Sequence, residues 1–351
     1  EVRATWGSTT PESARNSMRY TQKNVTENIT DKYLFITVNT ADNSGEMEVG
    51  MIYQLHNESL SIRVSTAGAE LQSIYSRKLD REYLWQAAPE AWGNHSLLLF
   101  PATGRISRSR VFVRGKEYPL PMHGFAKDMD FTLVKQTDQI LVLELTDTEE
   151  TLRMFPYPFS LQVEFSLKGD TVFQRFSVRN TGPGDMFFSL GAHPGFYCPI
   201  VLGESAGDYL LVFDRPQTVD KIILEPHTRL CTTAREPMLK DSSELPLFEG
   251  FFNGGPILSE GYDADWIEIR SRKSGHRIRI GIKDFPYITF WGVAHQMSLI
   301  CIEPWCGLSD FVGTDHIWEK KPAGNRLSPG AVFYRELFFQ PGRQTEVTTG
   351  R

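Results

Sequence analysis

One ten-residue segment alternates strictly between apolar and polar side chains. In Phe159–Lys168 every odd-numbered residue is Phe, Leu or Val, and every even-numbered residue is polar or charged. A period of two places one face of an extended chain against a core and the other face in water, so the segment predicts a strand of an antiparallel sheet. The Gly- and Pro-containing turn at residues 180–184 separates two further strand-like segments. The chain is therefore expected to consist of consecutive antiparallel strands.

Strand-like segments recur from Met51 onwards, and helix signals are few and short. The helix signals are confined to Thr148–Phe155, which ends before Pro156, and to one turn at Ser243–Phe248. Neither a linker nor an internal repeat divides residues 51–351, so we expect one large all-β domain, an antiparallel sandwich or barrel with few short helices. The other expected strands are Met51–Leu55, Leu60–Val64, Glu70–Ser76, Phe131–Gln136, Ile140–Thr146, Thr171–Arg179, Met186–Leu190, Tyr209–Phe213, Trp266–Ser271, Arg277–Ile282, Tyr287–Trp291, Leu299–Glu303 and Phe333–Phe339.

The composition excludes several classes of function. With 37 Lys+Arg, 43 Asp+Glu and no long basic block, the chain has a net charge of −6 and is a poor candidate for binding nucleic acid. It contains no run of about 18 apolar residues, so no membrane span is predicted. The four cysteines form no CxxC pair, and we expect them to be reduced in a cytoplasmic protein. Neither a phosphate loop nor a dinucleotide fingerprint is present.

Residues 1–50 differ in character from the rest. They are rich in Thr, Asn, Ser and Glu, and their one strand-like piece is Tyr33–Val38. At Met51 the sequence changes to the opening of a strand. We therefore expect residues 1–50 to be an N-terminal extension, disordered or non-native upstream sequence, and residues 51–351 to be the folded domain. A native, poorly ordered arm is the alternative.

Four short segments place polar groups in apolar surroundings, at residues 100–106, 121–127, 189–197 and 300–305. If strand alternation continues through the third segment, His193 shares a face with Gly191. The Pro and Gly that follow are expected to end this strand, so that His193 lies at its mouth. In the last segment the side chains of Cys301, Glu303 and Trp305 share a face.

These residue types are suited to acid/base chemistry on a sugar. One Glu and one or two His are sufficient for a general base and a general acid. Aromatic rings nearby suit the apolar face of a sugar. Other interpretations of the same residues remain open. Each His taken alone is more typical of a turn or of a satisfied core position, and Glu303 of a buried ion pair with Arg105. A His/His/Glu set also binds zinc, although the spacing here does not support a zinc site.

Seven motifs occur in a fixed order between Met51 and about residue 340. They are Asn57-Glu-Ser-Leu60, Gly68-Ala-Glu-Leu71, Tyr83-Leu-Trp-Gln86, Phe100-Pro-Ala-Thr-Gly-Arg105, His123-Gly-Phe-Ala-Lys-Asp128, Gly191-Ala-His-Pro-Gly-Phe196 and Cys301-Ile-Glu-Pro-Trp-Cys-Gly307. No single motif is specific, but the ordered set resembles a bacterial branch of the aldose 1-epimerase (mutarotase) family. The resemblance implies a galactose mutarotase-like antiparallel β-supersandwich, without a cofactor or metal, that interconverts the α and β anomers of a free aldohexose.

The resemblance also implies roles for individual residues. Glu303 matches the general base that removes the proton of the C1 hydroxyl, and His193 matches the general acid that protonates the ring oxygen. His123 matches the second histidine, which assists at the ring oxygen or positions the sugar. Arg105 matches the arginine that binds substrate hydroxyls. The aromatic residues expected to carry the sugar are Phe196, Trp291 and Trp305.

One position departs from the family pattern. Members carry an Asp in an Asn-Asp-Ala-Leu stretch that holds sugar hydroxyls, whereas the matching stretch here, residues 253–257, has no acid. Asp263 or Asp265 is expected to stand in, and we take Asp265 as a substrate-binding residue. This departure leaves the preferred sugar open.

Two alternatives to a free-sugar epimerase remain open. One is a catalytically weak sugar-binding or sensing protein on the same fold, since a fold does not determine a function. The other is an epimerase of a hexose 6-phosphate, which needs additional cations at the pocket, with Lys127 and Arg108 as candidates. We expect a small-molecule sugar as the partner, and a monomer or homodimer.

Overall fold

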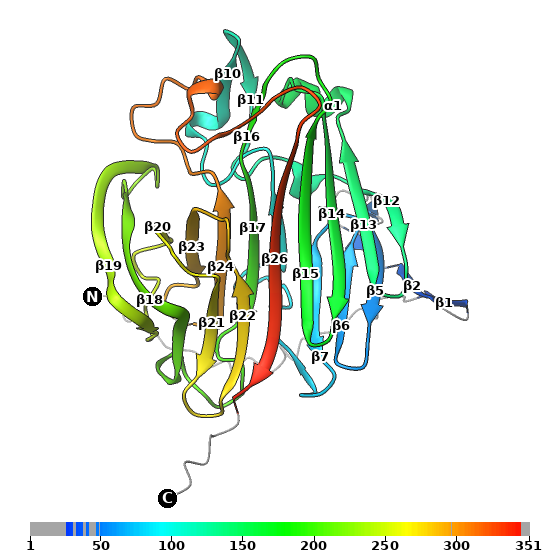
Figure 1. The fold of residues 1–351 in the computed structure, drawn as a ribbon, viewed down its shortest axis with the longest axis vertical. Helices are drawn as coiled ribbons and strands as arrows, with labels where there is room; N and C mark the ends of the chain where they lie inside the picture. The colour runs from blue at the N-terminus through cyan, green and yellow to red at the C-terminus, as the bar shows by residue number, and fades with distance from the viewer. Residues whose placement is uncertain are drawn as a thin grey trace, which may run out of the picture.

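The computed structural model is a β protein built mainly on one sheet of fourteen strands (Figure 1). The structure describes residues 50–295 and 297–344, together with 26–30, 33–37, 40–41 and 47–48. Neighbouring strands in this sheet pair antiparallel. Across the sheet, the order is β12 (Thr132–Gln136), β13 (Ile140–Thr146), β14 (Phe159–Lys168), β15 (Thr171–Asn180), β26 (Val332–Arg343), β22 (His276–Gly281), β21 (Trp266–Ser271), β18 (Tyr209–Leu224), β20 (Ile257–Glu260), β23 (Tyr287–Gly292), β24 (Leu299–Cys306), β17 (Leu190–Tyr197) and β9 (Ser96–Leu99), with β19 (Cys231–Pro246) paired to β18.

A second sheet has six strands, and three two-stranded sheets complete the β structure. The six are, in order, β1 (Thr26–Thr30), β2 (Tyr33–Thr37), β5 (Met51–His56), β6 (Leu60–Ser65), β7 (Leu71–Ser76) and β8 (Arg81–Glu82). The two-stranded sheets pair β3 (Thr40–Ala41) with β4 (Met47–Glu48), β10 (Arg110–Val113) with β11 (Lys116–Pro119), and β16 (Met186–Phe188) with β25 (Asn325–Leu327). The expectation for residues 1–50 falls largely outside the described residues and stays a prediction.

Helices are short. The α-helix α1 (Glu149–Met154) begins with a capping box between Thr148 and Thr151, within the segment for which the sequence predicts a helix. The 3₁₀ turns are η1 (Ser107–Ser109), η2 (Ala126–Asp128), η3 (Ala206–Asp208) and η4 (Trp318–Lys320). Within the described part of the chain, no helix has the length and apolar character needed to cross a membrane.

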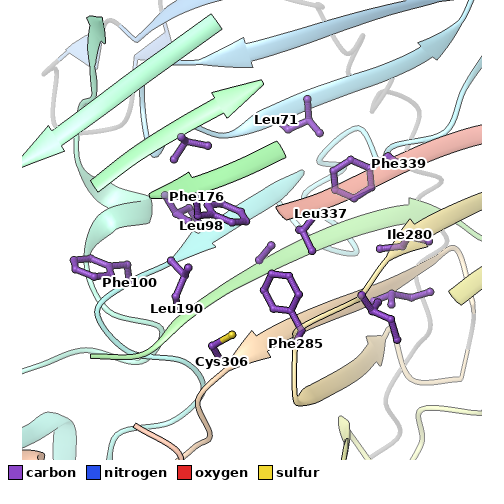
Figure 2. Packing of buried hydrophobic residues seen from close by; sticks show 14 of the residues in the cluster. Leu71, Leu98, Phe100, Phe176, Leu190, Ile280, Phe285, Cys306, Leu337 and Phe339 are labelled. Carbon is purple, nitrogen blue, oxygen red and sulfur yellow. The ribbon is translucent and has the colours of Figure 1, made fainter. Parts of the chain in front are cut away.

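The hydrophobic core lies between the two large sheets. Leu71 on β7, Phe176 on β15, and Leu337 and Phe339 on β26 are completely buried and belong to one cluster (Figure 2). In Figure 1, β5, β6 and β7 lie behind β14 and β15. The alternation in Phe159–Lys168 has its predicted consequence, since its odd-numbered residues are buried and its even-numbered residues are partly or fully exposed.

The strands expected from the sequence are confirmed, except that Met186–Leu190 is divided at Ser189 between β16 and β17, which belong to different sheets. The expected turn of helix at Ser243–Phe248 is wrong. Residues 231–246 form the long strand β19 instead, and Leu245 and Pro246 lie opposite Leu211 and Leu210 of β18. Pairing with the preceding strand β18 outweighs the local preference of such a short segment. The result is a long, curved β18–β19 hairpin at one side of the molecule (Figure 1).

Glu70, just before β7, holds the segment that leads into β9. Its Oε1 accepts hydrogen bonds from the backbone N–H groups of His95 and Ser96, at 2.8 and 3.1 Å. Its Oε2 lies 3.3 Å from Nδ1 of His95. Burial opposes ionisation of this carboxyl, but the hydrogen bonds and the charge interaction with His95 hold its pKa below the usual value. A carboxylate in the Gly-Ala-Glu-Leu motif therefore anchors an edge strand of the large sheet.

Replacing Glu70 with Ala is expected to lower the free energy of unfolding by about 3 kcal/mol, because two backbone donors lose their partner. Urea unfolding measures the change. Gln72→Ala, on the adjoining strand β7, is the control: it removes a side chain that donates to Oε2 of Glu70 at 3.3 Å but leaves the backbone contacts of Glu70 in place, with an expected cost below about 1 kcal/mol. Equal costs for the two variants would contradict an anchoring role for Glu70.

Candidate active site

The centre of the site is a row of side chains that crosses five neighbouring strands. Leu258 on β20 lies opposite Thr289 on β23, which lies opposite Glu303 on β24. On the other side, His193 of β17 lies opposite Leu97 of β9. The register of β17 against β24, on either side of this row, places His193 across from Glu303. All five residues line one cavity of about 500 Å³, so strand pairing assembles its floor.

The expectation that His193 lies at the end of its strand is wrong. β17 continues through Pro194 and Gly195, because Pro194 pairs with Ser96 of β9 and Gly195 pairs with Cys301 of β24. Partners on both sides keep the backbone extended where the local sequence favours a turn. His193 is consequently held in the middle of a central strand rather than at its end.

Trp291 and Trp305 flank the row. Each lies two residues beyond a member of the row on its own strand, and side chains two residues apart on a strand point to the same face. A Cβ atom at Gly191 would lie 2.7 Å from Cδ1 of Trp305, so glycine leaves the room that the indole occupies. Both tryptophans line the cavity, as expected of sugar-binding residues.

Trp92 covers His193. The two rings stack with their centroids 4.8 Å apart at an angle of 24°, and Trp92 meets Trp291 edge to face at 5.8 Å. A Cβ atom at Gly195 would lie 2.8 Å from Trp92, so this glycine also makes room for an indole. Trp92 was not among the residues predicted from the sequence. The only available signal was a tryptophan in the segment between β8 and β9.

His123 reaches the cavity from the segment between β11 and η2. Its Nδ1 accepts a hydrogen bond from the backbone N–H of Gly104 at 3.2 Å, and its own backbone N–H donates to the Gly104 carbonyl at 3.0 Å. In the neutral ring the remaining proton is therefore on Nε2. The ring centroid lies 5.6 Å from that of His193 and 5.8 Å from that of Trp305. The motif residues His123 and His193 are thus neighbours in space.

Arg105 lies at the edge of the cavity on a segment held by its backbone. Its N–H donates to the Ser309 hydroxyl at 3.0 Å, and its carbonyl accepts from the N–H of Asp310 at 2.8 Å. The Asp310 carboxylate forms a buried ion pair with Lys321. These contacts fix the backbone that carries Arg105. Among the described residues, the expected ion pair between Arg105 and Glu303 is not formed.

Burial keeps the central acid/base pair uncharged. Nε2 of His193 lies 3.3 Å from Oε1 of Glu303, and both residues are almost fully buried. Burial raises the pKa of the Glu303 carboxyl well above its usual value, against a smaller opposing effect of Trp305. Burial and the nearby His123 lower the pKa of His193 well below its usual value. The pair therefore holds one proton in common rather than two separate charges.

His123 is neutral as well. Burial, with smaller effects of Lys127 and Arg105, lowers its pKa to about 4. At neutral pH its Nε2–H is a hydrogen-bond donor that faces the cavity without adding charge.

Six of the eight residues expected to act in the site lie on this cavity, and two do not. The six are Glu303, His193, His123, Arg105, Trp291 and Trp305. Phe196 is completely buried on the opposite face of β17, where it packs on Phe339, because it is an odd number of residues from His193. Asp265 is half exposed and pairs with Arg215 at 2.9 Å, away from the cavity. Asp263 likewise pairs with Arg215 at 3.5 Å.

Several further cavity residues were not predicted from the sequence. Besides Trp92 they include Asn94, Asp128, Arg229 and Thr289. Asp128 closes the His-Gly-Phe-Ala-Lys-Asp motif and was visible there. Arg229 and Asn94 belong to connecting segments, which carry no periodic pattern, so their positions depend on the fold alone.

The comparisons with known proteins identify the family. A family model described as aldose 1-epimerase matches residues 51–242. The chain is 32% identical over 286 residues to Protein LacX from Lactococcus lactis subsp. lactis, a match that covers 80% of this chain and 95% of that protein. The chain belongs to the aldose 1-epimerase family. It is accordingly an isomerase, and its fold is the galactose mutarotase-like β-sandwich that the sequence predicted.

Solved structures agree with this assignment. A galactose mutarotase related enzyme from Lactobacillus acidophilus superposes with a TM-score of 0.80 at 30% identity, covering 84% of this chain and 99% of its own. A galactose mutarotase-like protein from Lactobacillus casei has a TM-score of 0.75 at 27% identity, with coverages of 83% and 100%. The large sheet that forms the cavity floor is therefore part of a shared architecture.

His123→Asn is expected to make the protein less sensitive to acid. The native state holds His123 neutral down to a pKa of about 4, whereas an unfolded chain protonates it near the ordinary value of about 6.5. Between these values the unfolded state binds more protons, so stability falls as the pH falls. Asn tolerates the left-handed backbone that His123 adopts, at φ 66°.

Urea unfolding at pH 7 and pH 5 measures this effect. Wild type should lose roughly 2 kcal/mol more than His123→Asn between these pH values. The exposed His56 on β5 supplies the control, and His56→Asn should behave as wild type. Equal losses in wild type and His123→Asn would contradict the assignment.

Proposed function

We propose that the protein interconverts the α and β anomers of an aldohexose by acid/base opening and closure of the sugar ring. The observation that carries this proposal is the contact of 3.3 Å between His193 and Glu303 at the floor of a cavity walled by tryptophans. Anomerisation moves protons at two oxygens, the C1 hydroxyl and the ring oxygen, and both are bonded to the same carbon. Two adjacent acid/base groups match two such oxygens.

The proposed cycle uses one proton of the pair. When the proton of the pair is on His193, Glu303 removes the proton of the C1 hydroxyl while His193 protonates the ring oxygen, and the C1–O5 bond breaks to give the open-chain aldehyde. Rotation about the C1–C2 bond presents the other face of the carbonyl. Reclosure reverses the two roles and restores both groups. Because one proton serves the pair, the same groups also support the cycle that starts with the proton on Glu303 and a neutral His193.

Other residues of the cavity bind and orient the sugar in this proposal. The Nε2–H of His123 donates to the ring oxygen or a neighbouring hydroxyl, which is consistent with its accepting contact at Nδ1. Arg105 binds hydroxyls at the rim. Trp291 and Trp305 contact the apolar face of the ring, and Trp92, stacked on His193, screens the imidazole from water.

Glu303→Gln and His193→Asn are each expected to reduce anomer exchange by at least about 100-fold, since each removes a proton-transfer group. Polarimetry or NMR exchange measurements on α-glucose and α-galactose report the rate. Glu164→Gln, on the outer face of β14, is the control and should retain the wild-type rate. If both active-site variants kept wild-type rates, the assigned roles would be refuted. Sugar binding without any wild-type acceleration would favour the binding-protein alternative.

A second candidate substrate, an aldohexose 6-phosphate, is favoured by the charges of the cavity wall. Arg105, Lys127 and Arg229 all line the cavity, with Asp128 as the acid beside Lys127. Arg229 donates a hydrogen bond to the Gly254 carbonyl at 2.6 Å, in the stretch where the family acid is missing. A guanidinium therefore lies beside the stretch that carries a carboxylate in other members. Arg108, the other cation considered, does not line this cavity.

The Arg229→Gln variant tests whether the preferred substrate carries a 6-phosphate. If the 6-phosphate is the preferred substrate, the variant should lower kcat/KM for glucose 6-phosphate at least about tenfold and change that for glucose less than about threefold. Lys273→Gln, on the turn between β21 and β22, is the control. Equal effects on the two sugars, or a wild-type enzyme that prefers free glucose, would exclude the phosphate without affecting the proposed chemistry.

A further inference from the structure

Cys301 lies beside the acid/base pair and has no part in the proposed reaction. It precedes Glu303 by two residues on β24, so both side chains point to the same face of the sheet. Ligand atoms of His193, Cys301 and Glu303 all lie within 4.8 Å of one another, and all three residues are buried. An imidazole, a thiol and a carboxyl converge here from two adjacent strands.

These three groups are a donor set for a thiophilic divalent cation. Zinc binds Cys sulfur at about 2.3 Å and His nitrogen or carboxylate oxygen at about 2.0 Å, which places tetrahedral ligands about 3.5 Å apart. The contact between His193 and Glu303, at 3.3 Å, already has this spacing. The second oxygen of Glu303, Oε2, is buried as well. The three ligand atoms, now within 4.8 Å of one another, would need to approach to about 3.5 Å to bind one zinc ion.

The surroundings support a three-ligand site with one open position. Trp92 and Trp291 pack against the small buried cluster that contains Cys301 and keep bulk water from the thiol. His193 and Glu303 line the cavity, so a metal held by these residues would be accessible from it. Three protein ligands and an open position are the arrangement of zinc sites that exchange a water molecule. A cation reaches the site through the same cavity that admits the sugar.

We propose that Zn²⁺ binds to His193, Cys301 and Glu303 and reversibly inhibits the enzyme by occupying its acid/base pair. Binding is ligand exchange without oxidation or reduction. The neutral imidazole donates its lone pair, the thiol releases its proton to solvent as the thiolate binds, and a protonated Glu303 releases its proton likewise. With both acid/base groups coordinated, neither transfers a proton to or from the sugar. The metal is thus an inhibitor and not a cofactor. Only its predicted effect on the rate rests on the proposed function; the metal site itself does not.

Cobalt binding tests the site independently of activity. Co²⁺ replaces Zn²⁺ in such sites, and a thiolate ligand gives a charge-transfer band in the near ultraviolet that His and carboxylate ligands do not give. One equivalent of Co²⁺ should produce this band in wild type, and Zn²⁺ should displace it. Cys301→Ala and Cys301→Ser should each lose the band. Cys198→Ala, which removes another buried thiol, should keep it.

Anomer exchange supplies the second readout. Zn²⁺ should inhibit wild type and Cys198→Ala, and EDTA should restore their rates. Cys301→Ala should exchange anomers at the wild-type rate without metal and need at least about tenfold more Zn²⁺ for half inhibition, since it loses one of three ligands. The metal site is overturned if wild type gives no thiolate band, or if zinc inhibits wild type and Cys301→Ala equally. An enzyme with no anomer exchange that still gives the Cys301-dependent band would refute the proposed function alone.

Discussion

The register of β17 against β24 is the constraint on which the site depends. It places His193 across from Glu303, and the pairings of β23, β20 and β9 extend that row to the cavity walls. A slip of one residue would turn every side chain of β17 to the other face, moving His193 into the core and Phe196 into the cavity. Partners on both edges of β17 and β24, together with complete burial of β24, hold this register.

Burial then determines the chemistry of the pair. In water a carboxylate and an imidazole titrate near about 4 and about 6.5. Under Trp92 and between Trp291 and Trp305, the carboxyl of Glu303 and the imidazole of His193 both favour their neutral forms. In the proposed reaction, one proton shared by two neighbouring groups would serve proton movements at two oxygens of one carbon. The Cys301 thiol lies two residues before Glu303 on the same face of β24, so the proposed proton-transfer site adjoins the proposed metal ligands.

Much of this arrangement was predictable because it is local. Period-two alternation located most strands, and it was sufficient to put Glu303 and Trp305 on one face. The ordered motifs predicted the family, which the comparisons confirm. The failures have a common cause. The segment at Ser243–Phe248 and the continuation of the strand past His193 both depend on pairing with another strand, and the local pattern of either segment contains no information on that pairing.

The limits of local pattern also explain the two misplaced site residues and those that were missed. Phe196 belonged to a matching motif, yet its parity on β17 sends it to the core, and Asp265 lies near the missing acid in sequence but pairs with Arg215 in space. Trp92 and Arg229 reach the cavity from connecting segments whose course only the tertiary structure specifies. Residue type and strand period are properties of the chain itself, and they were sufficient for the fold class, whereas the chemical roles of Glu303 and the two histidines stay predictions. Which side chains share the cavity follows from long-range strand pairing, because contacts between distant segments form only when the whole sheet is assembled.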